Sequence, residues 1–221
     1  MTKSLVIVGA GPGLGAAMAQ RFAAEGWAIG LVANRQEVLD NATAELEPTG
    51  VSVCAAFADV TDAESVEQAF AEIRDAIGVP SMVVYNASIY QAEPALELST
   101  DALMLALKIH VLGALNTVKP AVATMEDADH GVLVFTVNTL ATHPEAASTA
   151  LSIGKGAQLN LALSLDLELA ESPVDVAIVT ITQPISAGTA FDPANIAEVY
   201  WRIAQQDHAG FQRDHTFDGS G

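Results

Sequence analysis

Two kinds of segment alternate along the chain. Short, continuous apolar runs of four to eight residues are typical of strands that are covered on both faces. The longer segments between them repeat apolar residues at helical spacing, as Leu14, Met18 and Phe22 do. The apolar runs predict strands over residues 5–8, 28–33, 51–57, 81–85, 131–137 and 174–181. The helical spacing predicts helices from residue 14, over 36–47, from 61 to about 77, and over 99–125, 148–170 and 194–206. Thr61 and Glu64 have the spacing of a capping box and are expected to open the third of these helices.

This alternation predicts the fold class. Strand–helix–strand units with right-handed crossovers build a doubly wound parallel sheet, the Rossmann fold, with helices on both faces. We expect a single α/β domain over residues 1–221 with six or seven strands, because the sequence shows no repeat, low-complexity tract or linker. The polar stretch 213–221 is expected either to fray or to lie along an edge of the sheet. Ligands in such folds bind beyond the carboxyl ends of the strands.

Glycines recur at every second position directly after the first apolar run, at Gly9, Gly11, Gly13 and Gly15. Glycine permits positive φ and a close approach of the backbone to a ligand. The helix that starts at Leu14 would direct its free N–H groups and its positive dipole end at this turn. The place of the turn between a strand and a helix favours a dinucleotide phosphate site over the alternative, an ordinary strand-to-helix turn.

Charge narrows the choice of ligands. The net charge is −18, from 27 acidic and 9 basic residues, and such an acidic surface repels nucleic acid and anionic membranes. A site for an anionic cofactor must therefore be locally basic or use backbone N–H groups. The five histidines show no metal-ligand spacing, so no metal site is expected.

Signals for location favour the cytoplasm. No apolar run approaches the ~20 residues of a membrane span, and the first strand starts too near Met1 to leave room for a signal peptide. Cys54 is the only cysteine and lies in a predicted strand, where a buried and inert thiol is expected. We therefore expect a cytoplasmic protein that spans no membrane.

Taken in order, the motifs resemble those of the short-chain dehydrogenase/reductase family over nearly the whole chain. The segment from Val8 to Gly15 is similar to the family's Thr-Gly-x-x-x-Gly-x-Gly turn, with Val8 in place of threonine. Lys155 stands where the family has the active-site lysine that holds the cofactor ribose. The resemblance implies a nicotinamide dinucleotide cofactor, a small carbonyl or alcohol substrate, and a homodimer or homotetramer. The cofactor-binding residues that it implies are Gly9, Gly11, Gly13, Leu14, Gly15, Asn34, Arg35, Asp59, Val60, Asn86, Ala87, Lys155, Pro184 and Thr189.

Arg35 bears on the choice of cofactor. Relatives that use NAD have an acidic residue at the end of the second strand, whereas this chain has Ala33 there, followed by Asn34 and Arg35. An arginine can pair with the 2′-phosphate of NADP and stack on the adenine. The sequence therefore favours NADP(H) over NAD(H), and the alternative is a solvated arginine at a helix start.

The catalytic half of the pattern is incomplete. The family's proton-transferring tyrosine would stand four residues before the lysine, where this chain has Leu151. Its substrate-binding serine corresponds to about Asn138, whose amide could still donate a hydrogen bond, and its helix asparagine corresponds to His110. The resemblance thus implies Lys155, Asn138 and His110 as the residues of a degenerate catalytic site. The mobile substrate lid that usually precedes the last helix is essentially absent, since Thr189 is followed closely by the helix start at Asp192.

Three functions remain open at this point. The chain could be a relative that binds NADP(H) without the usual reaction, as a cofactor sensor or a partner subunit. It could be an active oxidoreductase with a rebuilt proton donor, for which the candidates are His110, His143, Tyr90 and Lys155. It could also be a non-catalytic assembly subunit, because the segments 99–125 and 148–170 resemble the helices through which the family dimerises. We favour the first.

Overall fold

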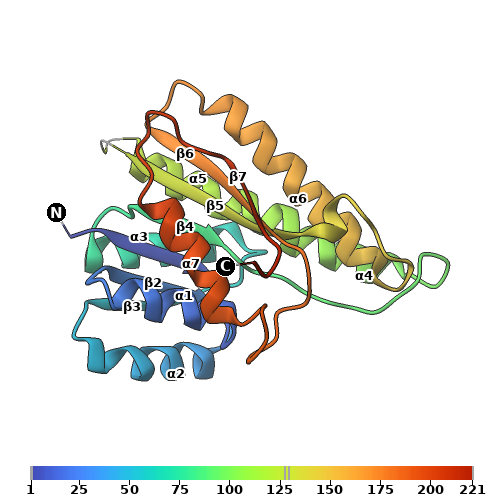
Figure 1. Ribbon diagram of the computed structural model, residues 1–221, viewed down its shortest axis with the longest axis horizontal. Coiled ribbons are helices and arrows are strands. Elements are labelled where there is room, and N and C mark those ends of the chain that lie inside the picture. The colour runs from blue at the N-terminus through green and yellow to red at the C-terminus, as the bar shows by residue number, and fades with distance from the viewer. Residues whose placement is uncertain (1, 127, 129, 221) are drawn as a thin grey trace.

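The computed structural model describes residues 2–126, 128 and 130–220. Within them, seven strands form one sheet in the order β3-β2-β1-β4-β5-β6-β7, and each neighbouring pair is parallel (Figure 1). The strands are β1 (Ser4–Val8), β2 (Ala28–Ala33), β3 (Val53–Phe57), β4 (Met82–Tyr85), β5 (Gly131–Asn138), β6 (Val174–Ile181) and β7 (Asp214–Phe217). The predicted doubly wound parallel sheet is confirmed, and the order reverses between β1 and β4, where ligands bind in this architecture.

Helices cover both faces of this sheet (Figure 1). They are α1 (Leu14–Ala23), α2 (Gln36–Leu46), α3 (Ala63–Ile77), α4 (Thr100–Leu107), α5 (Gly113–Met125), α6 (Thr149–Glu168) and α7 (Pro193–Ala204). One apolar core joins the sheet to α1, α2 and α7, and a second joins it to α3, α5 and α6. Strand β1 shows the cause: Leu5 and Ile7 enter the first core, and Val6 and Val8 the second, since successive side chains of a strand point to opposite faces.

Two local predictions need correction. The predicted helix over 99–125 is interrupted by a π-helical turn, Lys108–Leu112, that separates α4 from α5. Helix α3 is capped by Asp62, whose carboxylate accepts the N–H groups of Glu64 and Ser65, so Thr61 and Glu64 do not form the expected capping box. The stretch 213–221 contains β7, which pairs with β6, and this confirms the sheet-edge alternative over fraying.

The expectation about membrane-spanning length also needs correction. The continuous helical stretch Thr100–Met125 has a mean hydropathy of 1.3 and is long and apolar enough to cross a membrane by these two criteria. Its inner residues Ala114, Val118 and Met125 pack in the core between α3 and the sheet. A core helix of a globular domain can have the same length and composition, so these two criteria alone are weak evidence for a membrane span.

Candidate functional site

The glycine turn joins β1 to α1 at the carboxyl end of the sheet. Gly9 has φ of 91°, and a Cβ atom at this position would lie 2.4 Å from the backbone nitrogen of Ala87. The N–H of Gly9 donates to the carbonyl oxygen of Val32 at 2.9 Å, and Nδ2 of Asn86 donates to the carbonyl oxygen of Gly9 at 3.0 Å. Only glycine fits here, and these bonds fix the turn against β2 and against the loop that follows β4.

Gly11 and Gly13 differ from Gly9 in their surroundings. Neither has positive φ, and a Cβ atom at either position would meet no atom within 4 Å. Gly13 is the N-cap residue of α1, and no side chain caps this helix. An uncapped helix start with open space before it fits a phosphate group, because free N–H groups and the positive end of the helix dipole face that space. The turn therefore fits the pyrophosphate of a dinucleotide.

A cavity of about 410 Å³ opens beside the turn. Arg35 borders it, is exposed, and forms no ion pair with any residue that the structure describes, so its guanidinium is available to an anionic ligand. Asp59, across the cavity, holds its loop in place: its Oδ1 accepts the N–H and the hydroxyl of Thr61, both at 2.9 Å. Eight of the expected cofactor residues line this cavity: Gly9, Gly11, Asn34, Arg35, Asp59, Val60, Asn86 and Ala87.

A second cavity, of about 750 Å³, adjoins the first and shares Asn86 and Ser88 with it. It lies between the ends of β5 and β6 and the start of α6. The expected residues that line it are Leu14, Asn86, Asn138, Lys155 and Pro184. Other polar or titratable residues in its wall include Ser88, Tyr90, Thr139, His143, Glu145 and Ser148. Leu151, one turn before Lys155 on α6, contributes an apolar side chain to the same wall.

Lys155 is 4% exposed, and its side chain extends from α6 to the backbone of β5. Its Nζ donates to the backbone oxygen of Thr136 at 2.8 Å and to Oε1 of Gln158 at 3.0 Å. Burial lowers the pKa of Lys155 to about 7, because the charged ammonium loses its hydration there. An ammonium group has three N–H donors, so one remains for a ligand in the cavity.

His110 lies in the π-helical turn, deep between α4 and α6, and is absent from the lining of either cavity. Its ring covers Gly154, where a Cβ atom would lie 2.5 Å from Cδ2 of His110. Its Nε2 is 3.4 Å from the carbonyl oxygen of Ile89, and its buried Nδ1 has no partner among the described residues. Burial, and then the charge of Lys155, lower the pKa of His110 to about 4, so the imidazole is neutral near pH 7.

The three tyrosines lie in different surroundings. The hydroxyl of buried Tyr85 donates to the carbonyl oxygen of Ile109, and that of Tyr200 bonds Oγ1 of Thr136 at 2.7 Å, on the α7 side of the sheet. Burial raises the pKa of both phenols above the ordinary value. Tyr90 is 63% exposed and is the tyrosine that lines the wider cavity.

Asn138 ends β5 at the wall of the wider cavity, where its Oδ1 is buried and has no hydrogen-bond partner among the described residues. A buried amide oxygen without a partner is costly, so this atom can accept a hydrogen bond from a ligand hydroxyl or amide. The hydroxyl of the neighbouring Thr139 donates to the carbonyl oxygen of Thr182 at 3.5 Å. Of these two side chains, Asn138 is therefore the one whose oxygen is available to a ligand.

The connection from β6 to α7 contains no helix in the structure, and every residue of it is described. It folds on itself: Thr189 Oγ1 donates to the carbonyl oxygen of Ser186 at 2.7 Å, and the carboxylate of Asp192 accepts the N–H of Gly188 at 2.6 Å. Thr189 lines neither of the two cavities, whereas Pro184, the other expected residue of this segment, lines the wider one.

Sequence reasoning missed the partners of Lys155. Gln158 is fully buried, binds the lysine, and its Nε2 lies 3.4 Å from the same Thr136 oxygen. The sequence did contain a signal for Gln158: it lies three residues after Lys155, and side chains at positions i and i+3 of a helix are neighbours. The role of Thr136 could not be found this way, because β5 and α6 are brought together only by the fold.

Comparisons with known proteins agree with this fold. The family model described as short chain dehydrogenase matches residues 3–190. An uncharacterised oxidoreductase of Staphylococcus aureus strain MW2 is 27% identical over 216 residues, which cover 93% of each chain. The fold is similar to that of an alcohol dehydrogenase from the archaeon Thermococcus sibiricus complexed with 5-hydroxy-NADP (TM-score 0.89, 22% identity, 98% and 96% of the chains covered). It is also similar to that of a metagenomic short-chain oxidoreductase in complex with NADP (TM-score 0.87, 21% identity, 97% and 96% covered). The chain belongs to the short-chain dehydrogenase/reductase family.

Proposed function

We propose that this protein binds NADP(H) across the two cavities and turns over carbonyl or alcohol substrates slowly or not at all, as a cofactor sensor or a partner subunit. The observation that carries the proposal is the contrast at α6. Lys155 is in place beside the wider cavity, but the cavity wall one turn before it is formed by Leu151. A leucine side chain can neither give nor take a proton.

The cofactor half of the site supports NADP(H). The pyrophosphate would lie at the uncapped start of α1, and the adenosine would lie in the cavity bordered by Asp59, with the 2′-phosphate beside Arg35. The nicotinamide would enter the wider cavity past Asn86, near Pro184 and Ile185. The similar structures from Thermococcus sibiricus and from the metagenome hold 5-hydroxy-NADP and NADP, respectively. When bound, the nicotinamide supplies or accepts a hydride.

The α6 position one turn before Lys155 carries no acid, because it is occupied by Leu151. Two N–H groups of Lys155 are bound by protein acceptors, and His110 lies outside the cavity lining. The loss of a positioned proton donor typically lowers a rate by ~10²–10⁴. The compact connection before α7 offers no helical lid to exclude water, which works in the same direction.

A second candidate function is an active oxidoreductase with a rebuilt donor. Two titratable side chains favour it because they line the wider cavity, the phenol of Tyr90 and the imidazole of His143. Either could transfer a proton to a substrate held by Asn138.

Assembly is compatible with both candidates. Apolar side chains are exposed on α4, on the π-helical turn and on α6: Met104, Leu105, Leu112, Ile153 and Leu167. A homodimer or homotetramer would cover such a surface, as the resemblance to the family implies.

Initial rates of NADPH oxidation with a panel of aldehydes and ketones distinguish the two candidates. The first predicts rates at the background level for the wild type. Ordinary turnover would overturn it, and the variants Tyr90→Phe and His143→Gln would then show which side chain acts. A loss of activity in one variant but not in the other would support the second candidate.

A further inference from the structure

Three metal-ligating side chains meet at the end of the sheet opposite the cavities. His130 directly precedes β5, Asp175 is the second residue of β6, and His208 lies in the connection between α7 and β7. Nε2 of His130 and Nδ1 of His208 lie 2.8 and 3.0 Å from the same oxygen, Oδ2 of Asp175. All three ligand atoms lie within 4.8 Å of one another. We infer that this cluster, the His130–Asp175–His208 site, binds a divalent transition-metal ion, with Zn²⁺ as the ion that it suits.

The donor set carries the chemical part of this inference. Two imidazole nitrogens and one carboxylate oxygen are ligands of Zn²⁺, at about 2.0–2.2 Å each. Atoms bound tetrahedrally at such lengths lie about 3.3 Å apart. The two histidine–aspartate distances are shorter than this by only a few tenths of an ångström, and small side-chain rotations would make up the difference. The fourth position would remain for water.

Packing around the cluster holds the ligands and leaves an entry path. The carboxylate side chain of Asp175 is 15% exposed, whereas the imidazoles of His130 and His208 are 30% and 52% exposed. Phe211 packs edge-on against the ring of His130, with the centroids 6.4 Å apart. The two imidazole rings are 5.7 Å apart and tilted by 57°, so they face the shared carboxylate and do not stack on each other.

The charges around the cluster favour a cation. Among the described residues, the ion-pair partners of Asp175 are these two histidines, and no lysine or arginine neutralises its carboxylate. The chain as a whole carries a net charge of −18. Both features raise the local concentration of a divalent cation.

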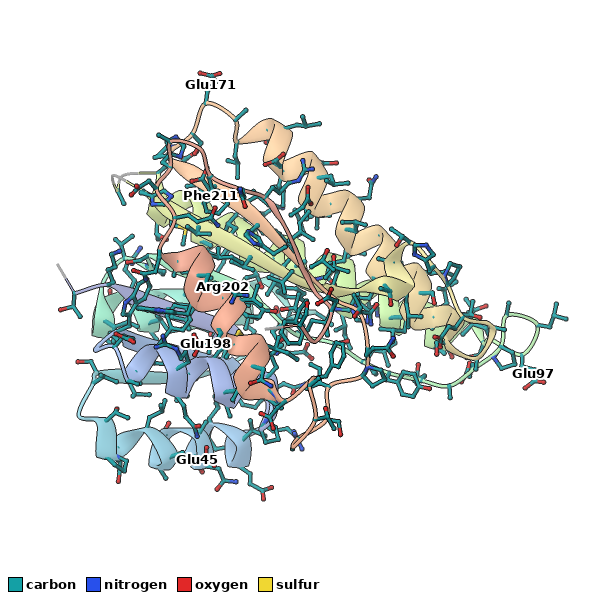
Figure 2. The ribbon with its side chains drawn as sticks, in the orientation of Figure 1. Glu45, Glu97, Glu171, Glu198, Arg202 and Phe211 are labelled. Carbon is teal, nitrogen blue, oxygen red and sulfur yellow. The ribbon has the colours of Figure 1, made fainter. Side chains whose placement is uncertain are left out.

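The place of the cluster indicates a structural role. Figure 2 draws Phe211 toward the end of the sheet that also carries Glu171, and Glu97 toward the other end. Asn138, the last residue of β5, lies eight residue steps after His130, a distance of about 26 Å at ~3.3 Å per step. A metal ion here would tie the segment before the short edge strand β7 to β5 and β6. The inference is independent of the proposed cofactor binding.

The alternative is a hydrogen-bonded His–Asp–His cluster that binds no metal. The variant His208→Gln separates the two, because the amide can still donate to Asp175 but supplies no imidazole ligand. Asp175→Asn keeps the shape of the carboxylate and removes its charge. His143→Ala is the matched control, since it removes a histidine at the other end of the sheet.

The test is a calorimetric titration of metal-free, full-length protein with Zn²⁺ alone, with Mg²⁺ as a hard-cation comparison. We expect one Zn²⁺ per chain and a rise in the unfolding midpoint of roughly 5–10 °C at a hundredfold excess over Kd. Affinity should fall roughly tenfold or more in His208→Gln and Asp175→Asn, and should be unchanged in His143→Ala. X-ray absorption should show nitrogen and oxygen ligands at about 2.0–2.2 Å.

Two results would overturn the inference. One is the absence of Zn²⁺ binding by the wild type. The other is an unchanged Zn²⁺ affinity in both His208→Gln and Asp175→Asn, which would assign the binding to the acidic surface. Because His208 is half exposed, its glutamine variant is expected to fold, and circular dichroism checks this directly.

Discussion

The two cavities share Asn86 and Ser88, yet different parts of the chain form the rest of their walls. The cavity beside the glycine turn is lined by the turn itself, by the loops that follow β2, β3 and β4, and by Arg35, which forms no ion pair among the described residues. The wider cavity depends on side chains of β5 and α6, and at its reacting end these are an apolar Leu151 and a Lys155 bound to protein atoms. The difference predicts that dinucleotide binding and proton transfer are separable in this fold.

The separation has a physical cause. Gly9 is required for the fold itself, since any side chain there would collide with Ala87, so the cofactor turn persists as long as the protein folds. Leu151 is buried, and an apolar side chain is stable there whether or not chemistry occurs at this position. We therefore expect that a single side chain at the proposed reacting end can be exchanged without loss of the fold or of the proposed cofactor site.

The largest expected effect comes from restoring a phenol at the reacting end. Leu151→Tyr should raise the rate of NADPH-dependent carbonyl reduction by ~10²–10⁴ over the wild type, because it places a proton donor one turn from Lys155. The matched control is Leu151→Phe, which has the same ring without the hydroxyl. Equal rates for the two variants, measured with the same carbonyl panel, would contradict the role given to this position.

The next prediction separates the glycine that the fold requires from a glycine that ligand binding requires. Gly9→Ala should lower the free energy of unfolding by about 2–4 kcal/mol, because φ is positive and the methyl group meets the backbone. Gly11→Ala has free space for its methyl group, so unfolding should change by less than about 1 kcal/mol. That methyl group enters the cavity, however, and NADPH binding should weaken. Urea unfolding measures the stability of each variant, and calorimetry measures its affinity for NADPH. Normal NADPH binding by Gly11→Ala would count against the turn as the phosphate site.

Cofactor choice should depend on Arg35. Arg35→Ala should weaken NADPH binding roughly 10–100-fold, the usual size of a lost charge-assisted hydrogen bond, and should leave NADH binding within about twofold. Arg74→Ala removes the same charge from the outer face of α3 and serves as the control. Parallel losses for both cofactors would show that Arg35 does not contact the 2′-phosphate.

The last prediction concerns the buried ammonium of Lys155. The pKa of Lys155 is lowered to about 7 from an ordinary 10.5, so between these values the unfolded chain binds a proton that the folded chain does not. Folding stability from this group therefore rises with pH above 7, by up to about 1.4 kcal/mol per pH unit. Lys155→Met should abolish this contribution.

Urea unfolding of the wild type and of Lys155→Met at pH 7, 8 and 9 measures this contribution to stability. The free energy of unfolding of the wild type should rise relative to that of Lys155→Met as the pH rises, whatever the difference between them is at pH 7. A difference that stays constant over this range would mean that Lys155 remains protonated.

Local signals in the sequence predicted most of the architecture. Continuous apolar runs such as 5–8 and 28–33 correspond to strands of the sheet, because burial on both faces leaves no polar position within them. The glycine spacing likewise gave the turn before α1, since positive φ at Gly9 is a property of the backbone itself.

The features that were missed depend on contacts distant in sequence. His110 was expected in the site, but the π-helical turn and the space above Gly154 take its ring into the interior. His130 and His208 are 78 residues apart, so no ligand spacing could reveal that β6 brings Asp175 between them. The break between α4 and α5 contains neither glycine nor proline within Lys108–Leu112, and the π-helical turn contacts α6, a segment distant in sequence.

The measurement that tests the central claim most directly is a calorimetric titration of the wild-type protein with NADPH and, in parallel, NADH. Heat is the suitable signal, because Trp27 and Trp201 pack against Phe22 and line neither of the two cavities. We predict saturable binding of one NADPH per chain, tighter than that of NADH. Absence of binding by either cofactor would contradict the account and would reduce the glycine turn to an element of the fold.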